Sequence, residues 1–434
     1  MSHRSLSGIK LGMMLGILTA FNLLTNLVIQ WYVLVVLGPG IQTDALFASL
    51  TLPQIVVAVV SGSAVFVLVP LLTGLTDSDL RYDFWSFMWL ILGFFSIVAL
   101  LITLTADWWL GLLFPGFDAE GLALTGELTR IQAMAMVLTA ASSMLRALHH
   151  SQRRFILAEA APLVSSIGGL LLSLWALPRL GIVSIAWIML FRSAAQIGFL
   201  LRHAPTVSAP RIKRPSIQTA WRRLRPLLIG AVYYKLDPLV DRFFASATIA
   251  GGLSLYYLAQ QLYSIMLQVF TSATATPVAP TLAAAAREGN WERFRQVYRQ
   301  KLAVMFCIPL VAYLAFLVFG LPVLNVLVGH GQVTAENVGT LWLLMAALVG
   351  VPLAGSTGQI LSTAFYARGD TTTPTRVGIT GFTAGVVFKV IGFFHLGLLG
   401  IAIGTTLYYG CNAIAMLVIL ERDLKRVVAV SAQA

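Results

Sequence analysis

One apolar stretch, residues 224–246, carries four charged side chains in its interior, beyond Arg225 at its start: Lys235, Asp237, Asp241 and Arg242. Charged side chains at membrane depth are costly and normally face a wet cavity or one another. On a continuous helix, at about 100° per residue, Lys235 and Arg242 would lie about 20° apart on one face. Pro238 removes a backbone donor and predicts a kink. Two interpretations stay open: ion pairs that only hold helices together, and the wall of a polar translocation cavity.

A polar stripe on the first apolar segment is a second candidate. Asn22, Asn26 and Gln30 recur every four residues, so they share one face of a helix. Buried amides either bond a neighbouring helix or line a cavity, and the sequence leaves both alternatives open.

Asp44 follows the turn at residues 38–40 and opens the next apolar segment. Its carboxylate is either favoured by a helix N-terminus or part of an outer gate.

Three further charged residues stand alone in apolar segments: Glu159, Arg192 and Lys389. Glu159 and Lys389 could snorkel or pair with a neighbour, whereas Arg192 lies in the middle of its segment. Guanidinium and ammonium groups bind phosphate oxygens strongly, so a lipid pyrophosphate as ligand would need cations such as Arg192, Lys235 and Arg242. The aspartates could instead bind Na⁺ or H⁺ as a coupling ion.

The composition indicates a polytopic α-helical membrane protein. The chain of 434 residues is 58% hydrophobic and only 11% charged, whereas ordinary soluble domains are about 25% charged. At about 20 residues per span plus short loops, this length accommodates roughly twelve transmembrane helices. Cys307 and Cys411 both fall in apolar segments, which indicates neither a disulfide framework nor a metal site.

The distribution of basic residues predicts the topology. If the N-terminus is cytoplasmic and its first helix is retained, 23 of the 29 Lys and Arg residues fall in segments expected in the cytoplasm. This favours an even number of spans with both termini cytoplasmic, and it assigns the net charge of +12 to contact with anionic membrane lipids rather than nucleic acid. We expect a six-helix lobe over 1–202, a basic linker over 203–223, a second six-helix lobe over 224–420 and a cytoplasmic tail over 421–434.

Enzyme signatures are absent from the sequence. It contains no HExxH, GxSxG or Walker A pattern, and the short predicted outer loops leave no outer domain in which chemistry could occur. We therefore expect a transport protein rather than an enzyme, with no cofactor and no metal. A coupling ion, Na⁺ or H⁺, or the membrane potential would drive it, and we expect a monomer.

Several short motifs follow one another in a recognisable order along the chain. They are TDALF at 43–47, VDRFFASA at 240–247 and AFYARGDTTTPTRVG at 364–378. In these the chain resembles the MurJ/MviN lipid II flippase family of the multidrug/oligosaccharidyl-lipid/polysaccharide exporter superfamily, from the first predicted span through the twelfth. The resemblance implies two six-helix lobes around a cavity, alternating access, a location in the bacterial cytoplasmic (inner) membrane, and an undecaprenyl-pyrophosphate-linked glycan as substrate. Asp44, Asp241 and Arg242 match family positions.

Two features depart from the family pattern. Members usually carry two further C-terminal helices, whereas this chain stops after the twelfth predicted span. Members also carry arginines on the first two helices, whereas residues 11–80 contain no Lys or Arg and the arginine after an LPN-like motif is replaced within LPQIVV at 52–57. A less cationic site leaves a lipid-linked exopolysaccharide or O-antigen unit as an alternative substrate.

Two functional hypotheses therefore compete. The first is a flippase for a lipid-linked glycan such as lipid II, and the second is a cation-coupled multidrug antiporter of the same superfamily, which would favour acidic over basic cavity residues. For the flippase, the residues expected to line the cavity and contact the substrate are Asn22, Asn26, Asp44, Arg192, Lys235, Asp237, Asp241 and Arg242.

Overall fold

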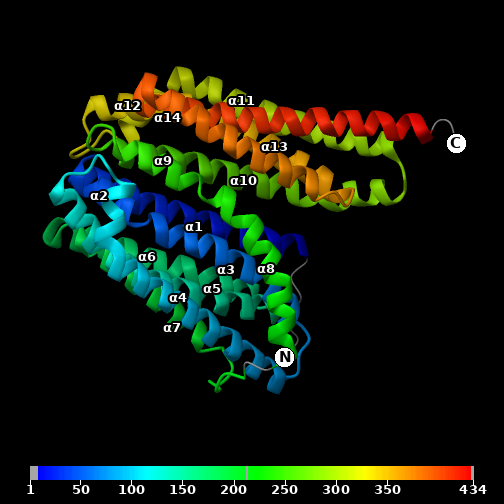
Figure 1. The fold of residues 1–434 in the computed structure, drawn as a ribbon, viewed down its shortest axis with the longest axis horizontal. Coiled ribbons are helices and arrows are strands. Elements are labelled where there is room, and N and C mark those ends of the chain that lie inside the picture. The colour runs from blue at the N-terminus through cyan, green and yellow to red at the C-terminus, as the bar shows by residue number, and fades with distance from the viewer. Residues whose placement is uncertain (1–7, 212–213, 432–434) are drawn as a thin grey trace. The chain divides into compact units, whose positions relative to one another are not determined.

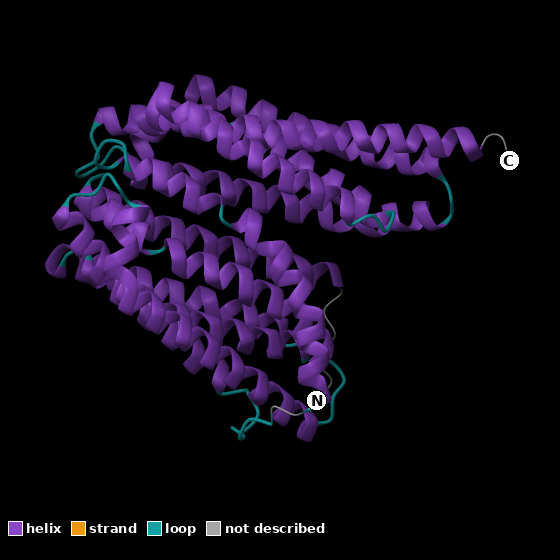
Figure 2. Cartoon of the chain, viewed as in Figure 1, coloured by secondary structure: helices purple, strands orange, loops and turns teal. Residues whose placement is uncertain are grey.

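The structure is helical throughout the part of the chain that it describes. The computed structural model describes residues 8–211 and 214–431, and every regular element within these ranges is a helix (Figures 1 and 2). The predicted all-α class is confirmed. The predicted first lobe, linker and tail each include residues outside the described ranges, namely 1–7, 212–213 and 432–434.

The first of two compact units is Met1–Gly251. Within it α5 packs against α3, α4 and α7, α1 packs against α6, and α8 packs against α3 and α4. Its helices are α1 (Gly8–Leu37), α2 (Ile41–Ser49), α3 (Thr51–Leu72), α4 (Asp77–Leu113), α5 (Ala119–Ser151), α6 (Phe155–Leu180), α7 (Val183–Leu201), α8 (Pro215–Lys235) and α9 (Asp237–Ser246).

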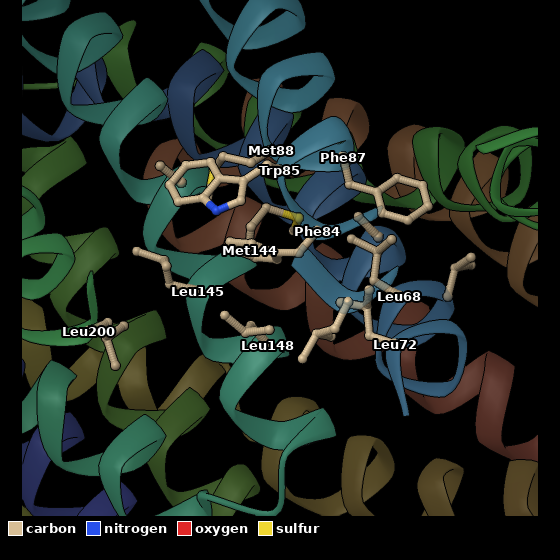
Figure 3. Packing of buried hydrophobic residues seen from close by; sticks show 14 of the residues in the cluster. Leu68, Leu72, Phe84, Trp85, Phe87, Met88, Met144, Leu145, Leu148 and Leu200 are labelled. Atoms are coloured by element: carbon tan, nitrogen blue, oxygen red, sulfur yellow. The ribbon is translucent and has the colours of Figure 1, made fainter. Parts of the chain in front are cut away.

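The core of this unit lies where α3, α4 and α5 meet. Leu68 of α3, Phe84 of α4 and Met144 of α5 belong to one cluster of buried apolar side chains (Figure 3). Where lipid surrounds the helices, dense van der Waals contact rather than expulsion of water stabilises such packing. Two indole groups of α4 hold the segment that follows α7. Trp85, which belongs to this cluster, donates to the carbonyl oxygen of Pro205, and Trp89 donates to that of Ser208, each at 3.0 Å.

The second compact unit is Gly252–Ala434. Its described helices are α10 (Gly252–Arg287), α11 (Trp291–Leu327), α12 (Ala335–Ala347), α13 (Gly350–Ala367) and α14 (Thr372–Ser431). Inside α14 the backbone leaves helical geometry at Gly397, with φ 56° and ψ −131°. This φ belongs to the left-handed region that glycine adopts without strain, and the break falls between the spans that the sequence predicts over 375–396 and 398–420.

Nine stretches of described helix are long and apolar enough to cross a membrane. One of them, Thr372–Arg426, has 55 residues, more than twice the length of about 20 residues that one crossing needs. The break at Gly397 divides it into two halves of suitable length. The count of twelve spans and the cytoplasmic location of both termini stay predictions.

The two units divide the chain at a different place from the predicted lobes. Packing joins residues 215–251, with α8 and α9, to the first unit, whereas the sequence assigns 224–251 to the second six-helix lobe. The predicted lobes rest on an expected sequence repeat and not on packing, so that division stays a prediction.

Candidate functional site

The charged stretch that contains Lys235 and Arg242 is two helices, not one. Helix α8 ends at Lys235, Leu236 forms a turn, and α9 begins at Asp237 with Pro238 in its first turn. The interruption that Pro238 predicts is therefore confirmed. Because the helix is broken, the expectation that Lys235 and Arg242 share one helical face is wrong: Lys235 is exposed, whereas Arg242 is buried.

Arg242 is tied to the junction between α2 and α3. Its Nη1 donates to the carbonyl oxygen of Phe47 at 3.3 Å and to Oγ1 of Thr51 at 2.9 Å, and its Nη2 donates to Oε1 of Gln54 at 2.8 Å. The side chain is only 6% exposed. The turn at Leu50, which separates α2 from α3, interrupts the helix beside the carbonyl group of Phe47. A break of this kind frees backbone acceptors for a side-chain donor.

Asp44 lies in the first turn of α2 and binds a distant backbone amide. Its carboxylate is 3% exposed, and Oδ2 accepts a hydrogen bond from the N–H of Gly251 at 2.7 Å. Gly40, not Asp44, holds the N-cap position of α2. Gly251 has φ +88°, and a Cβ there would lie 2.7 Å from the carbonyl carbon of Pro39. Only glycine fits this approach, so the contact needs this residue type.

A small cavity of about 130 Å³ adjoins Asp44. The turn after α4, with Gly116 and Asp118, and the turn after α9, with Ser246 and Thr248, complete its lining. A Cβ at Gly116 would collide with the backbone of Ser246. Three segments far apart in sequence therefore meet here through backbone contacts, and the buried Asp44 carboxylate joins two of them.

Asp237 and Asp241 are the two carboxylates of α9. Asp241 is fully buried and Asp237 is half-buried. Asp241 precedes Arg242 in the sequence. Its carboxylate lowers the net positive charge of α9, the helix that packs against α3.

Asn22, Asn26 and Arg192 form a second polar group, between α1, α6 and α7. Nη2 of Arg192 donates to Oδ1 of Asn26 at 2.6 Å and to Oγ of Ser166 at 2.8 Å. The Ser166 hydroxyl donates in turn to Oδ1 of Asn22 at 2.7 Å. Gly169, one turn along α6 from Ser166, leaves room for the guanidinium stem, because a Cβ there would lie 2.7 Å from Cγ of Arg192. The structure thus joins Arg192 to the stripe of Asn22 and Asn26, two features that the sequence singled out separately.

The polar seam of α1 continues to Glu159 of α6. Its carboxylate accepts from Nη2 of Arg146 at 2.8 Å, approaches Nε2 of His150 at 3.3 Å and accepts from Oγ1 of Thr19 at 3.3 Å. Of the two alternatives for Glu159, the structure therefore shows pairing. In the second unit Lys389 is fully buried, so it does not snorkel to a surface.

The ARGD motif at 367–370 ends α13 and forms the turn that leads into α14. Oδ1 of Asp370 accepts from the backbone amides of Thr372 and Thr373, both at 3.0 Å, and Gly369 has φ +80°. Burial raises the pKa of the Asp370 carboxyl, but these hydrogen bonds and the nearby Arg368 outweigh it and hold the pKa below its ordinary value. The motif therefore has a local structural role as a helix cap.

Sequence reasoning missed Ser166, Gln54 and Gly251, which supply the partners of Arg192, Arg242 and Asp44. Serine and glycine are common in membrane helices and turns, so neither gives a signal by itself. Gln54 carried a signal, since it is a polar residue inside LPQIVV, an apolar run.

Comparison with known proteins identifies the relatives of this chain. A family model described as lipid II flippase MurJ matches residues 34–432. A probable lipid II flippase MurJ of Vibrio cholerae is 26% identical over 195 residues, 45% of this chain and 37% of the relative. That of Thermotoga maritima is 21% identical over 412 residues, 93% of this chain and 84% of the relative. The matched regions span only 37%, 42% and 41% of the first three relatives.

Solved structures share the fold. A lipid II flippase MurJ in an inward closed conformation superposes with a TM-score of 0.81 at 16% identity, covering 96% of this chain and 90% of the other. An inward-facing multidrug transporter of the MATE family superposes with a TM-score of 0.77 at 16% identity, covering 95% and 96%. The predicted MurJ/MATE-like fold is confirmed. Because the family model covers most of the sequence, this multi-pass protein of the bacterial inner membrane belongs to the lipid II flippase MurJ family.

Proposed function

We propose that the protein is a flippase that moves an undecaprenyl-pyrophosphate-linked glycan precursor, lipid II or a similar unit, across the inner membrane by alternating access. The observation that carries this proposal is the family match over residues 34–432. The helical fold shared with a lipid II flippase supports it. The substrate is moved and not chemically changed, so the protein needs no catalytic group and no cofactor.

The pyrophosphate is the part of the substrate that needs protein charge. Arg242 is the strongest candidate to bind it, because Thr51 and Gln54 orient its guanidinium before substrate arrives. A fixed planar donor set of this kind matches phosphate oxygens. Lys235, the exposed last residue of α8, adds a second cation on a flexible side chain. Asp237 and Asp241 limit the positive charge so that the substrate can also leave.

Asp44 belongs to the conformational part of the proposed cycle. Its bond to the Gly251 amide joins the start of α2 to the turn after α9. Hydrogen bonds to a charged group contribute about 1.5–3 kcal/mol, which corresponds to roughly a tenfold to hundredfold change in a two-state population. We propose that making and breaking this contact biases the two access states. Asn22, Asn26 and Arg192 would act on the same cycle by fixing α1 to α6 and α7.

Rescue of a bacterial host depleted of its own lipid II flippase tests the proposal. The wild-type chain should restore growth, Arg242→Ala should not, and Arg242→Lys should restore it partly. Arg287→Ala is the matched control, since Arg287 is exposed and, among the described residues, bonds to Ala283 of its own helix. Immunoblots of membrane fractions must show equal amounts of each variant. Rescue by Arg242→Ala at the wild-type level would refute the assigned role, and lysis with well-inserted wild-type protein would refute lipid II as substrate.

If lipid II is not carried, a lipid-linked exopolysaccharide or O-antigen unit is the next substrate to test. The likeness to a MATE-family transporter and the buried carboxylates Asp44 and Asp241 favour a second candidate, cation-coupled multidrug antiport. Efflux of a cationic dye from a pump-deficient host separates it from lipid export. Collapse of the Na⁺ gradient, the H⁺ gradient or the membrane potential in turn would identify the driving force.

A further inference from the structure

An apolar groove crosses the first unit between α3, α4 and α8. Its volume is about 300 Å³. The walls are almost wholly apolar, and Leu90, Phe94 and Trp221 keep 38%, 46% and 59% of their surface exposed. The residues that line it are Val60, Ala64, Val67, Leu68, Phe87, Leu90, Ile91, Phe94, Ile217, Ala220, Trp221, Leu224 and Leu228.

The length of the groove suits a single lipid chain. Its α8 wall runs from Ile217 to Leu228, which is about 16 Å at 1.5 Å per residue. The hydrocarbon core of a bilayer is about 30 Å thick. The α8 wall is therefore about half as long as the hydrocarbon core is thick, which limits how much of one lipid chain the groove can hold.

Two arginines stand beside this wall of α8. At about 100° per residue, Arg225 lies about 40° around the helix from Trp221, and Arg222 lies on the same side, three residues before Arg225. Both side chains are exposed. None of the ion pairs between described residues involves either of them. The nearby Arg214 differs, because it pairs with Asp79 at 2.6 Å and with Asp83 at 2.8 Å.

We propose that this groove is a binding site for an anionic phospholipid. One acyl chain fills the groove, and the phosphate lies against Arg222 and Arg225. The apolar walls take the chain and exclude polar ligands, whereas the two cations select a negatively charged head group over a zwitterionic one. The lipid enters the groove laterally from the cytoplasmic leaflet, the side that the distribution of basic residues predicts for the start of α8. This inference does not depend on which glycan the protein carries.

A long isoprenoid chain is a poorer match for the same surface. The α8 wall of the groove is only about 16 Å long, so most of an undecaprenyl tail would lie outside it. An acyl chain of ordinary length is held over most of its extent.

Photolabelling in nanodiscs tests the site. The intact protein is placed in phosphatidylcholine discs that contain a trace of phosphatidylglycerol or phosphatidylcholine with a diazirine in one acyl chain, and labelled peptides are mapped after irradiation. We expect the phosphatidylglycerol probe to label the groove segments of α4 and α8 in preference to the phosphatidylcholine probe. In the double variant R222Q/R225Q the ratio of labelling by the phosphatidylglycerol probe to labelling by the phosphatidylcholine probe should fall about tenfold.

The matched control is R422Q/K425Q on α14. It removes two exposed cations at the same spacing, three residues apart, and it should keep the labelling pattern. Melting temperatures of both double variants should equal that of the wild type, since only exposed side chains change. Equal labelling by the two probes, or labelling unaffected by R222Q/R225Q, would overturn the proposal. So would displacement of the probe by geranylgeranyl pyrophosphate but not by unlabelled phosphatidylglycerol, which would assign the groove to an isoprenoid.

Discussion

Two adjacent glycines of α6 offer a sharp test of how Arg192 is held. A methyl group at Gly169 would lie 2.7 Å from Cγ of Arg192 and closer still to its Cδ, whereas one at Gly168 would meet nothing within 4 Å. Alanine at either position gains about 1 kcal/mol of helix propensity. At Gly169, overpacking costs about 1–3 kcal/mol, and each hydrogen bond that the displaced guanidinium loses costs about 1.5–3 kcal/mol. We expect a net destabilisation of at least about 2 kcal/mol for Gly169→Ala alone.

Thermal unfolding of the purified variants in one detergent measures this difference. For a unit of about 250 residues, 1 kcal/mol shifts Tm by about 2–4 °C, so Gly169→Ala should melt about 4–8 °C below the wild type. Gly168→Ala should melt at or above it. The double variant Gly169→Ala/Arg192→Ala should melt no lower than Arg192→Ala alone, because alanine at 192 has no atom at the Cγ or Cδ position that clashes with the new methyl group. If Gly169→Ala and Gly168→Ala melt together, Arg192 is not packed against α6 in this way.

Three further predictions concern other contacts. Gly251→Ala should lower Tm and weaken rescue, because φ +88° and the approach to Pro39 together cost about 1–3 kcal/mol; unchanged melting would contradict this. Glu159→Gln should lower Tm by a few degrees, since Arg146 loses its carboxylate partner at 2.8 Å but stays partly solvated; Glu120→Gln, at an exposed position, is the control. The lowered pKa of Asp370 gives stability that is present above about pH 3.9, the pKa in an unfolded chain, and is lost as pH falls through the lower folded pKa. Asp370→Asn should flatten that acid limb of a Tm–pH profile.

The helical class could be predicted because it depends on local composition. Continuous apolar runs need a helix to satisfy backbone groups in lipid, and Pro238 cannot continue the hydrogen bonding of α8 into α9. Both inferences need only neighbouring residues. The same locality made the angle between Lys235 and Arg242 wrong, since a helical wheel assumes an unbroken helix.

Partners across long sequence separations could not be predicted. Ser166 meets Asn22 from 144 residues away, and Gln54 meets Arg242 from 188 residues away. Nothing in a single sequence links positions at such distances. The stripe of Asn22 and Asn26 predicted which face of α1 is polar, but not that Arg192 would be its partner. Periodicity shows which face needs a partner, and packing decides what the partner is.

The pairing of Gln54 with Arg242 bears on the missing arginines of the first two spans. Gln54 lies in the LPQIVV segment, where the family resemblance predicts an arginine, and its neutral Oε1 accepts from Nη2 of Arg242 at 2.8 Å. A cation so close to Arg242 would repel it, whereas the amide orients it without adding charge. Arg192 is already bound to Asn26 and Ser166. Arg242 is held in the same way, by Phe47, Thr51 and Gln54, and residues 11–80 supply no further cation. Because the proposed site has few positive charges, Arg242→Ala should reduce transport more here than in a site with several spare cations.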